Sequence, residues 1–348
     1  MSKHIIGWDI GGAHLKAAVV NHSGEVIQVI QAPCPLWKGL TYLQQAIDNI
    51  LIQLPEHSYR HAVTMTGELV DCFNSREQGV AAILETLQNK IDDLDMQIFV
   101  GTQGFLLIEH IQPTDYLNIA SANWIASAEL TARHFRNGLF VDIGSTTTDI
   151  LLISNHTLKA LGYTDYQRLV SGELVYTGVI RTAVMAVAQQ AEFKGQSMGL
   201  MAEYFATMAD VYRLTGDLNP AHDQTDTADG ADKSPAASAL RLSRMTGYDF
   251  TEQDWPIWLA FADNLKQQQK QRIKLACQQQ LQRQTPSDPG CLIGAGVGRF
   301  LIREIAKDLG LAYFDFTQLF KQAHSISAVD AADCAPAVAV AYLAGGFG

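Results

Sequence analysis

A short motif that occurs twice is the feature of this sequence that most limits its fold. Asp9-Ile10-Gly11 and Asp142-Ile143-Gly144 each end an apolar run, and each is followed by small residues and a second apolar run. The two copies lie roughly one domain length apart along the chain. The repeat therefore predicts two related domains, each of which opens with a strand, a glycine turn and a second strand.

The chemistry of the motif indicates phosphate binding. Glycine allows a tight turn, and consecutive backbone N–H groups in such a turn form a concave anion site. Lys16 can add a positive charge after the first turn. The carboxylates of Asp9 and Asp142 would repel phosphate directly, so we expect each to act through Mg²⁺. The alternative is an ordinary β-hairpin with Asp at a turn position.

The predicted phosphate or nucleotide contacts come from three glycine motifs. The first turn supplies Gly11, Gly12, Ala13 and His14, and the second supplies Gly144, Ser145, Thr146, Thr147 and Thr148. The third motif, Gly294, Gly296 and Gly298, stands between a strand pattern and a helix pattern, where helix N-terminal amides lie beside an open backbone surface. Its spacing does not match the Rossmann fingerprint, and no Walker P-loop occurs in the chain.

Composition limits the class of protein. A chain of 348 residues with 47% hydrophobic residues is long enough for two medium domains. The net charge of −11 argues against a protein that binds nucleic acid without sequence preference. We find no secretion signal and no apolar run long enough to span a membrane, so we expect a cytoplasmic protein. The five scattered cysteines are expected to be buried free thiols.

Hydrophobic periodicity indicates an α/β chain. Strand patterns occur at residues 5–20, 25–31, 61–66, 97–100 and 139–153, and helix patterns occur at 40–54, 79–91, 118–133, 179–190, 300–309 and 335–343. Residues 192–290 read as mostly helical, with a polar interruption at 217–234.

The order of these motifs resembles the actin/Hsp70/sugar-kinase superfamily over essentially the whole chain. Four stretches carry a narrower resemblance, to the hydantoinase/oxoprolinase-related family linked to tetrahydromethanopterin-dependent one-carbon metabolism. They are Gly7-Trp-Asp-Ile-Gly-Gly-Ala-His-Leu-Lys16, Met65-Thr-Gly-Glu-Leu-Val-Asp-Cys-Phe73, Ala122-Asn-Trp124 and Asp142-Ile-Gly-Ser-Thr-Thr-Thr-Asp149. Archaeal members of that family are methanofuran-pathway synthases.

The resemblance implies two RNase H-like α/β domains around a central cleft. The first would span residues 1–137, with the C-terminal helix at 331–348 packing back on it. The second would span residues 138–330 and carry a helical insertion at 180–290. The implied reaction condenses a furan-methyl diphosphate with a phenolic acceptor, a tyramine- or tyrosine-glutamate compound, and releases pyrophosphate. The implied ligands are Mg²⁺ and a substrate diphosphate in place of ATP.

The resemblance also assigns roles to residues near the predicted cleft. Lys16 would stabilise the leaving pyrophosphate, and Glu68, Asp149 or Asp9 would accept the phenol proton. The predicted substrate contacts are Asn123, Trp124, Arg168 and Glu173. One departure concerns the first turn, where archaeal relatives tend to have Asn-Thr in place of His14-Leu15. His14 could donate to phosphate instead, or it could cap the hairpin.

Each of these residues also has a purely structural interpretation. Glu68 could be a solvated turn residue, Trp124 could pack in the core, and Arg168 with Glu173 could belong to a surface loop. In the Asp-rich segment, Asp223, Asp226 and Asp229 could form a lid, or the segment could be a solvated loop. The Gln-rich stretch at 266–283 is more typical of an exposed helix than of a nucleic-acid face.

Two rival functions need the same phosphate site. One is an ATP-dependent kinase or ATPase, and the other is a non-catalytic nucleotide-dependent assembly protein. The expected partners are small molecules, with neither nucleic acid nor membrane, and the chain could form a homodimer.

Overall fold

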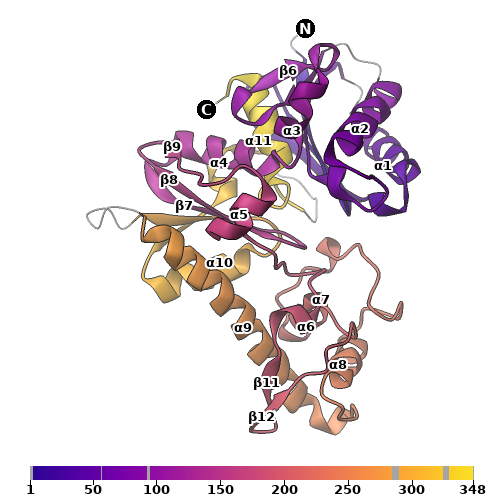
Figure 1. Ribbon diagram of the computed structural model, residues 1–348, viewed down its shortest axis with the longest axis vertical. Helices are drawn as coiled ribbons and strands as arrows, with labels where there is room; N and C mark the ends of the chain where they lie inside the picture. Colours follow the sequence, from indigo (N-terminus) through magenta and orange to yellow (C-terminus); the bar gives the residue numbers. More distant parts are fainter. Residues whose placement is uncertain (1–2, 56, 92–94, 284–289, 324–328, 348) are drawn as a thin grey trace. The chain divides into compact units, whose positions relative to one another are not determined.

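The computed structural model describes residues 3–55, 57–91, 95–283, 290–323 and 329–347. The chain forms two compact units (Figure 1). The first contains residues 1–137, 153–159 and 315–348, and the second contains residues 138–152 and 160–314. The predicted boundary placed residues 315–330 in the second domain. The structure groups them with the first, because β15 (Lys321–Gln322) pairs with β3 (Glu25–Pro33) there; residues 324–328 lie outside the described part.

The first unit is built on a seven-stranded sheet in the order β15-β3-β2-β1-β4-β5-β6. The remaining strands are β1 (His4–Ile10), β2 (His14–Val20), β4 (Tyr59–Met65), β5 (Met96–Phe99) and β6 (Phe105–Leu107). Strands β1, β2 and β3 form an antiparallel meander, and β4 and β5 extend it in parallel from β1. Because β1 and β4 are parallel, their carboxyl ends meet at one edge of the sheet.

Helices cover both faces of this sheet. Ile6, Trp8 and Ile10 pack in one core with α1 (Leu40–Leu51) and α2 (Arg76–Lys90). The intervening Gly7 faces α11 (Ala335–Gly345), where a Cβ would lie 1.8 Å from the carbonyl oxygen of Ala337. Helix α11 also packs on α4 (Asn123–His134), which follows the short α3 (Tyr116–Ile119). The period-two pattern of β1 thus places one helix layer on each face.

The second unit repeats the same strand order. The second sheet runs β10-β8-β7-β13-β14, and β9, which falls within residues 153–159, pairs with the end of β8. The strands are β7 (Asn137–Ile143), β8 (Thr148–Ser154), β9 (Thr157–Leu158), β10 (Leu174–Val175), β13 (Cys291–Ala295) and β14 (Ala312–Asp315). As in the first unit, the third strand is antiparallel to the second and the fourth is parallel to the first. This strand order in both units confirms the predicted duplicated RNase H-like α/β fold.

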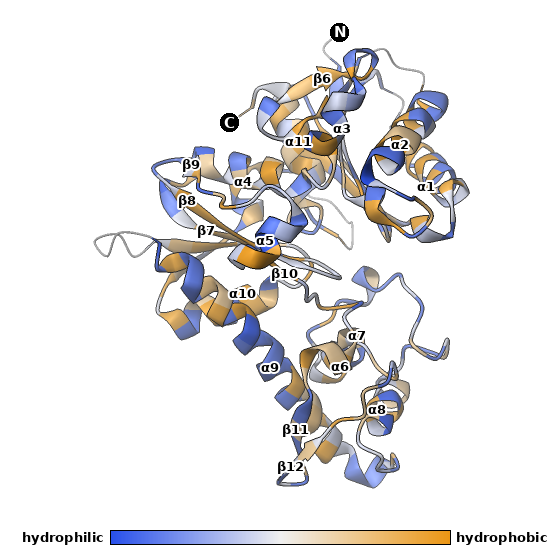
Figure 2. Ribbon diagram, viewed as in Figure 1, coloured by the Kyte–Doolittle hydropathy of each residue, from blue (hydrophilic) through white to orange (hydrophobic). Residues whose placement is uncertain are grey.

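The helices of the second unit pack on its sheet or on one another. They are α5 (Asp165–Ser171), α6 (Val184–Val187), α7 (Met208–Thr215), α8 (Pro235–Arg244), α9 (Trp255–Leu281) and α10 (Arg299–Leu309). The long helix α9 runs from beside α10 to the β11–β12 hairpin (Gln190–Phe193 and Gln196–Gly199) (Figures 1 and 2). The prediction of a mostly helical insertion at residues 180–290 missed this hairpin. Residues 284–289 of the predicted insertion lie outside the described part.

The predicted helix at residues 179–190 is wrong. Only the four residues of α6 are helical, and β11 begins at Gln190. The N–H groups of Val179, Ile180 and Arg181 donate instead to carbonyls of the Gly144–Ser145 turn. Tertiary hydrogen bonds therefore replace the first helical turn that the Ala- and Val-rich sequence favours.

Ion pairs fix the Asp-rich segment to its neighbours. Asp223 pairs with Arg213 at 2.5 Å, and Asp229 pairs with Arg241 at 3.1 Å and with Arg244 at 3.0 Å. Arg241 is fully buried and also pairs with Asp210 at 2.8 Å. The interpretation of this segment as a solvated loop is therefore wrong for the buried Asp223, whereas Asp229 is exposed and forms its ion pairs at the surface.

The Gln-rich stretch likewise has a structural use. Lys266, Lys270 and Lys274 on α9 pair with Glu304 and Asp308 on α10.

Four of the five cysteines are buried, all five are free, and Cys72 is exposed. In the described part of the chain, no helix has the length and apolar character needed to cross a bilayer.

Candidate functional site

The first glycine turn joins β1 to β2 in the first unit. Gly11 N–H donates to the His14 carbonyl at 3.0 Å, and His14 is buried at the start of β2. The carbonyls of Gly12 and Ala13 accept from Leu36 N–H and Cys34 N–H. Within the described residues, the N–H groups of Gly12 and Ala13 have no acceptor. Two consecutive amides are therefore available to bind an anion.

Asp9 and Lys16 lie directly opposite each other beside this turn. They are register partners in the β1–β2 pair. Asn123 Nδ2 donates to Asp9 Oδ1 at 3.3 Å, and Lys16 Nζ donates to the Asp333 carbonyl at 2.6 Å. The structure thus brings together three predicted site residues, Asp9, Lys16 and Asn123, from three different elements.

Two acidic residues at this place were missed by the sequence prediction. Asp330 and Asp333 precede α11 and accept hydrogen bonds from each other's backbone N–H groups at 3.2 Å and 2.9 Å. Burial raises the pKa of the adjacent Cys334 thiol to about 12, with Lys16 opposing this shift and Asp333, Asp9 and Asp330 adding to it. The available signal was two Asp residues three positions apart before a small-residue helix, which is a helix-start pattern.

Glu68 lies in a short turn just after β4. Its side chain is fully buried, and Ser121 Oγ donates to Oε1 at 2.7 Å. The preceding Gly67 packs against the first phosphate turn, since a Cβ there would lie 3.2 Å from the Ile10 carbonyl. The interpretation of Glu68 as a solvated turn residue is therefore wrong, and its place beside the turn fits a functional role.

Trp124 does not present its ring to solvent. It is 3% exposed in the first turn of α4. This placement agrees with the core-packing alternative rather than with stacking on a substrate ring.

The second glycine turn, in the second unit, has the same hydrogen-bond pattern as the first. Gly144 N–H donates to the Thr147 carbonyl at 2.9 Å. The Gly144 carbonyl accepts from Val179 N–H, and the Ser145 carbonyl accepts from Ile180 N–H. In the part of the chain that the structure describes, no acceptor is found for the N–H groups of Ser145 and Thr146. The two turns therefore offer equivalent pairs of backbone donors.

The third glycine motif packs directly on the second turn. At Gly296, where φ is +80°, a Cβ would lie 2.2 Å from Asp142 Oδ1. At Gly298 it would lie 2.4 Å from Ile143 Cγ2, and Gly298 N–H donates to the Ile143 carbonyl at 2.8 Å. Gly294 faces Tyr313 instead. Gly296 and Gly298 are therefore required for close packing on the turn, and a ligand contact from any of the three glycines stays a prediction.

The hydroxyl side chains of the turn fall into two groups. Ser145, Thr146 and Thr147 are half-buried, and the Ser145 and Thr146 hydroxyl oxygens lie 3.4 Å apart. Thr148 is fully buried and donates to the Thr177 carbonyl at 2.7 Å. Thr148 therefore holds β8 to the following segment, and the other three lie where a ligand could reach them.

Arg168 and Glu173 are buried, so the surface-loop interpretation is wrong for both. The Arg168 guanidinium forms an ion pair with Asp149. The Glu173 carboxylate accepts from Leu161 N–H at 2.8 Å, Gly162 N–H at 3.1 Å and Ser171 Oγ at 2.9 Å. Asp149, predicted as catalytic, thus pairs with Arg168, predicted to bind substrate. Glu173, the other predicted substrate residue, is bonded to neighbouring groups of the protein.

The donor set of each turn fits a magnesium-bound phosphate. Within the described residues, no group of three or more His, Cys, Asp or Glu side chains is placed to hold a metal. Mg²⁺ usually keeps several waters and takes one or two carboxylates plus substrate phosphate oxygens. Asp9 and Asp142, each beside a turn with two available N–H groups, are suited to that kind of binding.

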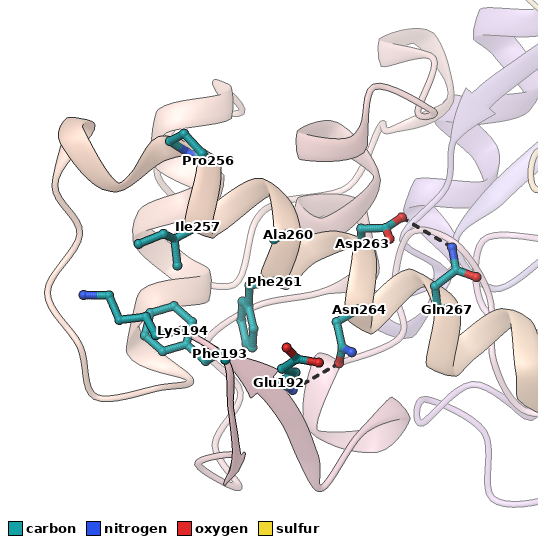
Figure 3. A pocket seen from close by; sticks show the side chains of 11 residues that line it. Glu192, Phe193, Lys194, Pro256, Ile257, Ala260, Phe261, Asp263, Asn264 and Gln267 are labelled. Carbon is teal, nitrogen blue, oxygen red and sulfur yellow. Dashed lines mark hydrogen bonds between the residues drawn. The ribbon is translucent and has the colours of Figure 1, made fainter.

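A separate hollow of about 450 Å³ lies between the β11–β12 hairpin and α9 (Figure 3). Phe193, Ile257 and Phe261 form its apolar part, and Glu192, Lys194 and Asp263 lie around it. None of the predicted site residues lines this hollow.

Comparison with known proteins identifies the family. The hydantoinase/oxoprolinase family model matches residues 60–338. The chain belongs to the hydantoinase/oxoprolinase family.

Two curated relatives share one name, (4-{4-[2-(gamma-L-glutamylamino)ethyl]phenoxymethyl}furan-2-yl)methanamine synthase. The protein from Methanocaldococcus jannaschii is 32% identical over 242 residues, 69% of this chain and 71% of the relative. The one from Methanococcus vannielii is 32% identical over 34% of this chain and 52% of the relative. A nucleotide-free structure of acetone carboxylase has a similar fold, with 10% identity, a TM-score of 0.51 and coverage of 89% of this chain and 68% of that chain.

Proposed function

We propose that this protein is a Mg²⁺-dependent transferase that condenses a furan-methyl diphosphate with a phenolic acceptor and releases pyrophosphate. The step would belong to the synthesis of a methanofuran-type cofactor in a tetrahydromethanopterin-linked one-carbon pathway. The observation that carries this proposal is the M. jannaschii relative, whose named product contains a phenoxymethyl-furan ether. A fold with two turns suited to phosphate supports a substrate that carries diphosphate.

The proposed step forms one bond and breaks one bond. The phenol oxygen attacks the methylene carbon attached to the furan ring, and the bond from that carbon to the diphosphate oxygen breaks. Its electron pair leaves with pyrophosphate, and a protein carboxylate accepts the phenol proton. Because charge develops mainly on the leaving group, donors fixed around the diphosphate would contribute most of the rate.

The residues of each unit have distinct roles in this proposal. The N–H pairs at Gly12–Ala13 and Ser145–Thr146 would bind diphosphate oxygens, and Lys16 would add positive charge. Each of Asp9 and Asp142 could help to hold Mg²⁺ beside its own turn, where the bound metal would neutralise part of the charge on the leaving pyrophosphate. Glu68, Asp149 and Asp9 are the candidate proton acceptors.

Calorimetry with Mg²⁺-pyrophosphate and with Mg²⁺-ATP tests the proposal against its rivals. We expect tight binding of pyrophosphate and negligible binding of ATP. Tight ATP binding with release of ADP would overturn the transferase and favour a kinase or ATPase. ATP-dependent oligomers without turnover would favour an assembly protein.

Three variants test the phosphate site itself. Asp9→Asn, Asp142→Asn and Lys16→Ala should each weaken Mg²⁺-dependent pyrophosphate binding by about tenfold or more, since each removes a charged group from the anion site. Asp48 lies on α1 and forms an ion pair with Lys90 on α2, so Asp48→Asn is a matched control for loss of one charge. If all three variants bind as the control does, the site assignment is wrong.

A further inference from the structure

Residues 175–182 fold onto the second glycine turn and are fixed there. A Cβ on Gly178 would lie 2.3 Å from the Thr146 nitrogen and 2.6 Å from the Gly144 carbonyl oxygen. Gly178 N–H donates to Thr182 Oγ1 at 2.7 Å, and Gln269 Nε2 on α9 donates to the Gly178 carbonyl at 2.9 Å. The backbone of this segment therefore has a defined position relative to the turn.

Arg181 lies at the point where this segment meets the turn. Its N–H donates to the Ser145 carbonyl at 2.8 Å. Its guanidinium Nη1 lies 3.5 Å from Thr146 Oγ1, and the side chain is half-buried. The hydrogen bond to the Ser145 carbonyl thus fixes the main chain of Arg181. The guanidinium extends to the hydroxyl of the next residue in the turn, Thr146.

The geometry of the Ser145–Thr146 peptide indicates what this cation could bind. A trans peptide directs its C=O and N–H in opposite directions, so the Thr146 N–H points away from the main-chain donors of residues 180 and 181. The guanidinium nevertheless reaches the hydroxyl of Thr146, the residue whose N–H would hold the anion. Asp142 places negative charge beside the turn, and Asp149 already engages Arg168, so a further cation such as Arg181 would stabilise an anion held there.

We propose that Arg181 is a substrate-binding residue that recognises the diphosphate at the second turn. This inference rests on the proposed function for the identity of the ligand. The guanidinium has five donors in a planar fork, so it can bond two phosphate oxygens and still contact Thr146. A lysine at this position would supply charge without the paired hydrogen bonds.

Calorimetry with Mg²⁺-pyrophosphate on three variants tests this role. We expect Arg181→Ala to weaken binding about tenfold or more, and Arg181→Lys to recover part of that loss. Arg303→Ala, which removes an exposed arginine of α10 in the same unit, should bind as the unchanged protein does. If Arg181→Ala and Arg181→Lys, both folded by circular dichroism, bind as Arg303→Ala does, the inference is wrong while the proposed function stands.

The same variants separate this inference from the proposed function. If the unchanged protein binds Mg²⁺-ATP instead of pyrophosphate, the transferase proposal fails. A loss of ATP affinity in Arg181→Ala, absent in Arg303→Ala, would then still support phosphate binding by Arg181. Failure of the unchanged protein to bind either anion would overturn both.

Discussion

Ser121 Oγ donates a hydrogen bond of 2.7 Å to Glu68 Oε1, which joins the segment after β4 to the segment before α4. Ser121 has a φ of 51°, in the left-handed region that non-glycine residues rarely adopt. The fold therefore accepts backbone strain at the residue that positions a buried carboxylate beside the first phosphate turn. Such strain is often found at functional sites.

Replacement of Ser121 separates the hydrogen bond from the backbone strain. Ser121→Ala should lower the free energy of unfolding by about 1–3 kcal/mol, because it removes a donor from a buried carboxylate. Ser121→Gly removes the same donor but adopts positive φ readily, so it should cost less. Urea denaturation of both variants measures the difference. Equal losses would show that the backbone conformation stores no strain.

Gly296 should not tolerate a side chain. Gly296→Ala combines a positive φ with a Cβ 2.2 Å from Asp142 Oδ1, so we expect a loss of at least about 2 kcal/mol or a displaced Asp142. Gly310→Ala is the matched control, since its φ is +66° and a Cβ there meets nothing within 4 Å. Its expected cost is only about 1 kcal/mol. Thermal denaturation compares the two variants, and equal stabilities would contradict the close packing of Gly296 on Asp142.

The contribution of the Asp-rich segment to the free energy of unfolding should come from its ion pairs rather than from its overall charge. Asp229→Ala leaves the buried Arg241 with one partner fewer, so we expect a loss of about 1–3 kcal/mol in the free energy of unfolding. Asp226→Ala removes the same charge nearby, and no ion pair of Asp226 is found in the described part of the chain. Chemical denaturation should therefore separate the two variants. Equal effects would mean that general electrostatics explains them.

Stability should fall as the pH drops below neutrality. Burial lowers the pKa of His4, and the neighbouring His57 and His22 lower it further. The folded state therefore binds this proton less readily than the unfolded chain does. The penalty is absent above the ordinary histidine pKa of about 6.5, grows as the pH falls from there towards the lowered value, and is complete below it. His57→Gln should reduce the loss of stability between pH 7.5 and 5, whereas exposed His110→Gln should leave it unchanged.

The sequence predicted the elements whose pattern is local. The two hairpins around Gly11 and Gly144 could be found because strand periodicity, glycine and Asp coincide within a few residues. Residues 179–190 could not be predicted correctly, because their helical composition is overridden by hydrogen bonds to a turn far away in the sequence. Asp333 and Arg181 were missed for a related reason, since only the fold brings them to Lys16 and Thr146.

The buried side chains show the same limit of sequence reasoning. Arg168 and Glu173 are charged residues in a glycine-punctuated loop, which is typical of a surface segment or a ligand contact. Their burial depends on Asp149 and on the backbone of residues 161–162, and no local pattern records these partners.

Turnover with both substrates measures the proposed reaction itself. The protein would be incubated with Mg²⁺, the aminomethylfuran-methyl diphosphate and a tyramine-glutamate or tyrosine-glutamate acceptor, with pyrophosphate and ether product measured together. We expect one pyrophosphate to be released for each ether formed, without ATP, and both to fall sharply in Asp142→Asn. Formation of a phosphorylated product at the expense of ATP, with no ether from the diphosphate, would contradict it.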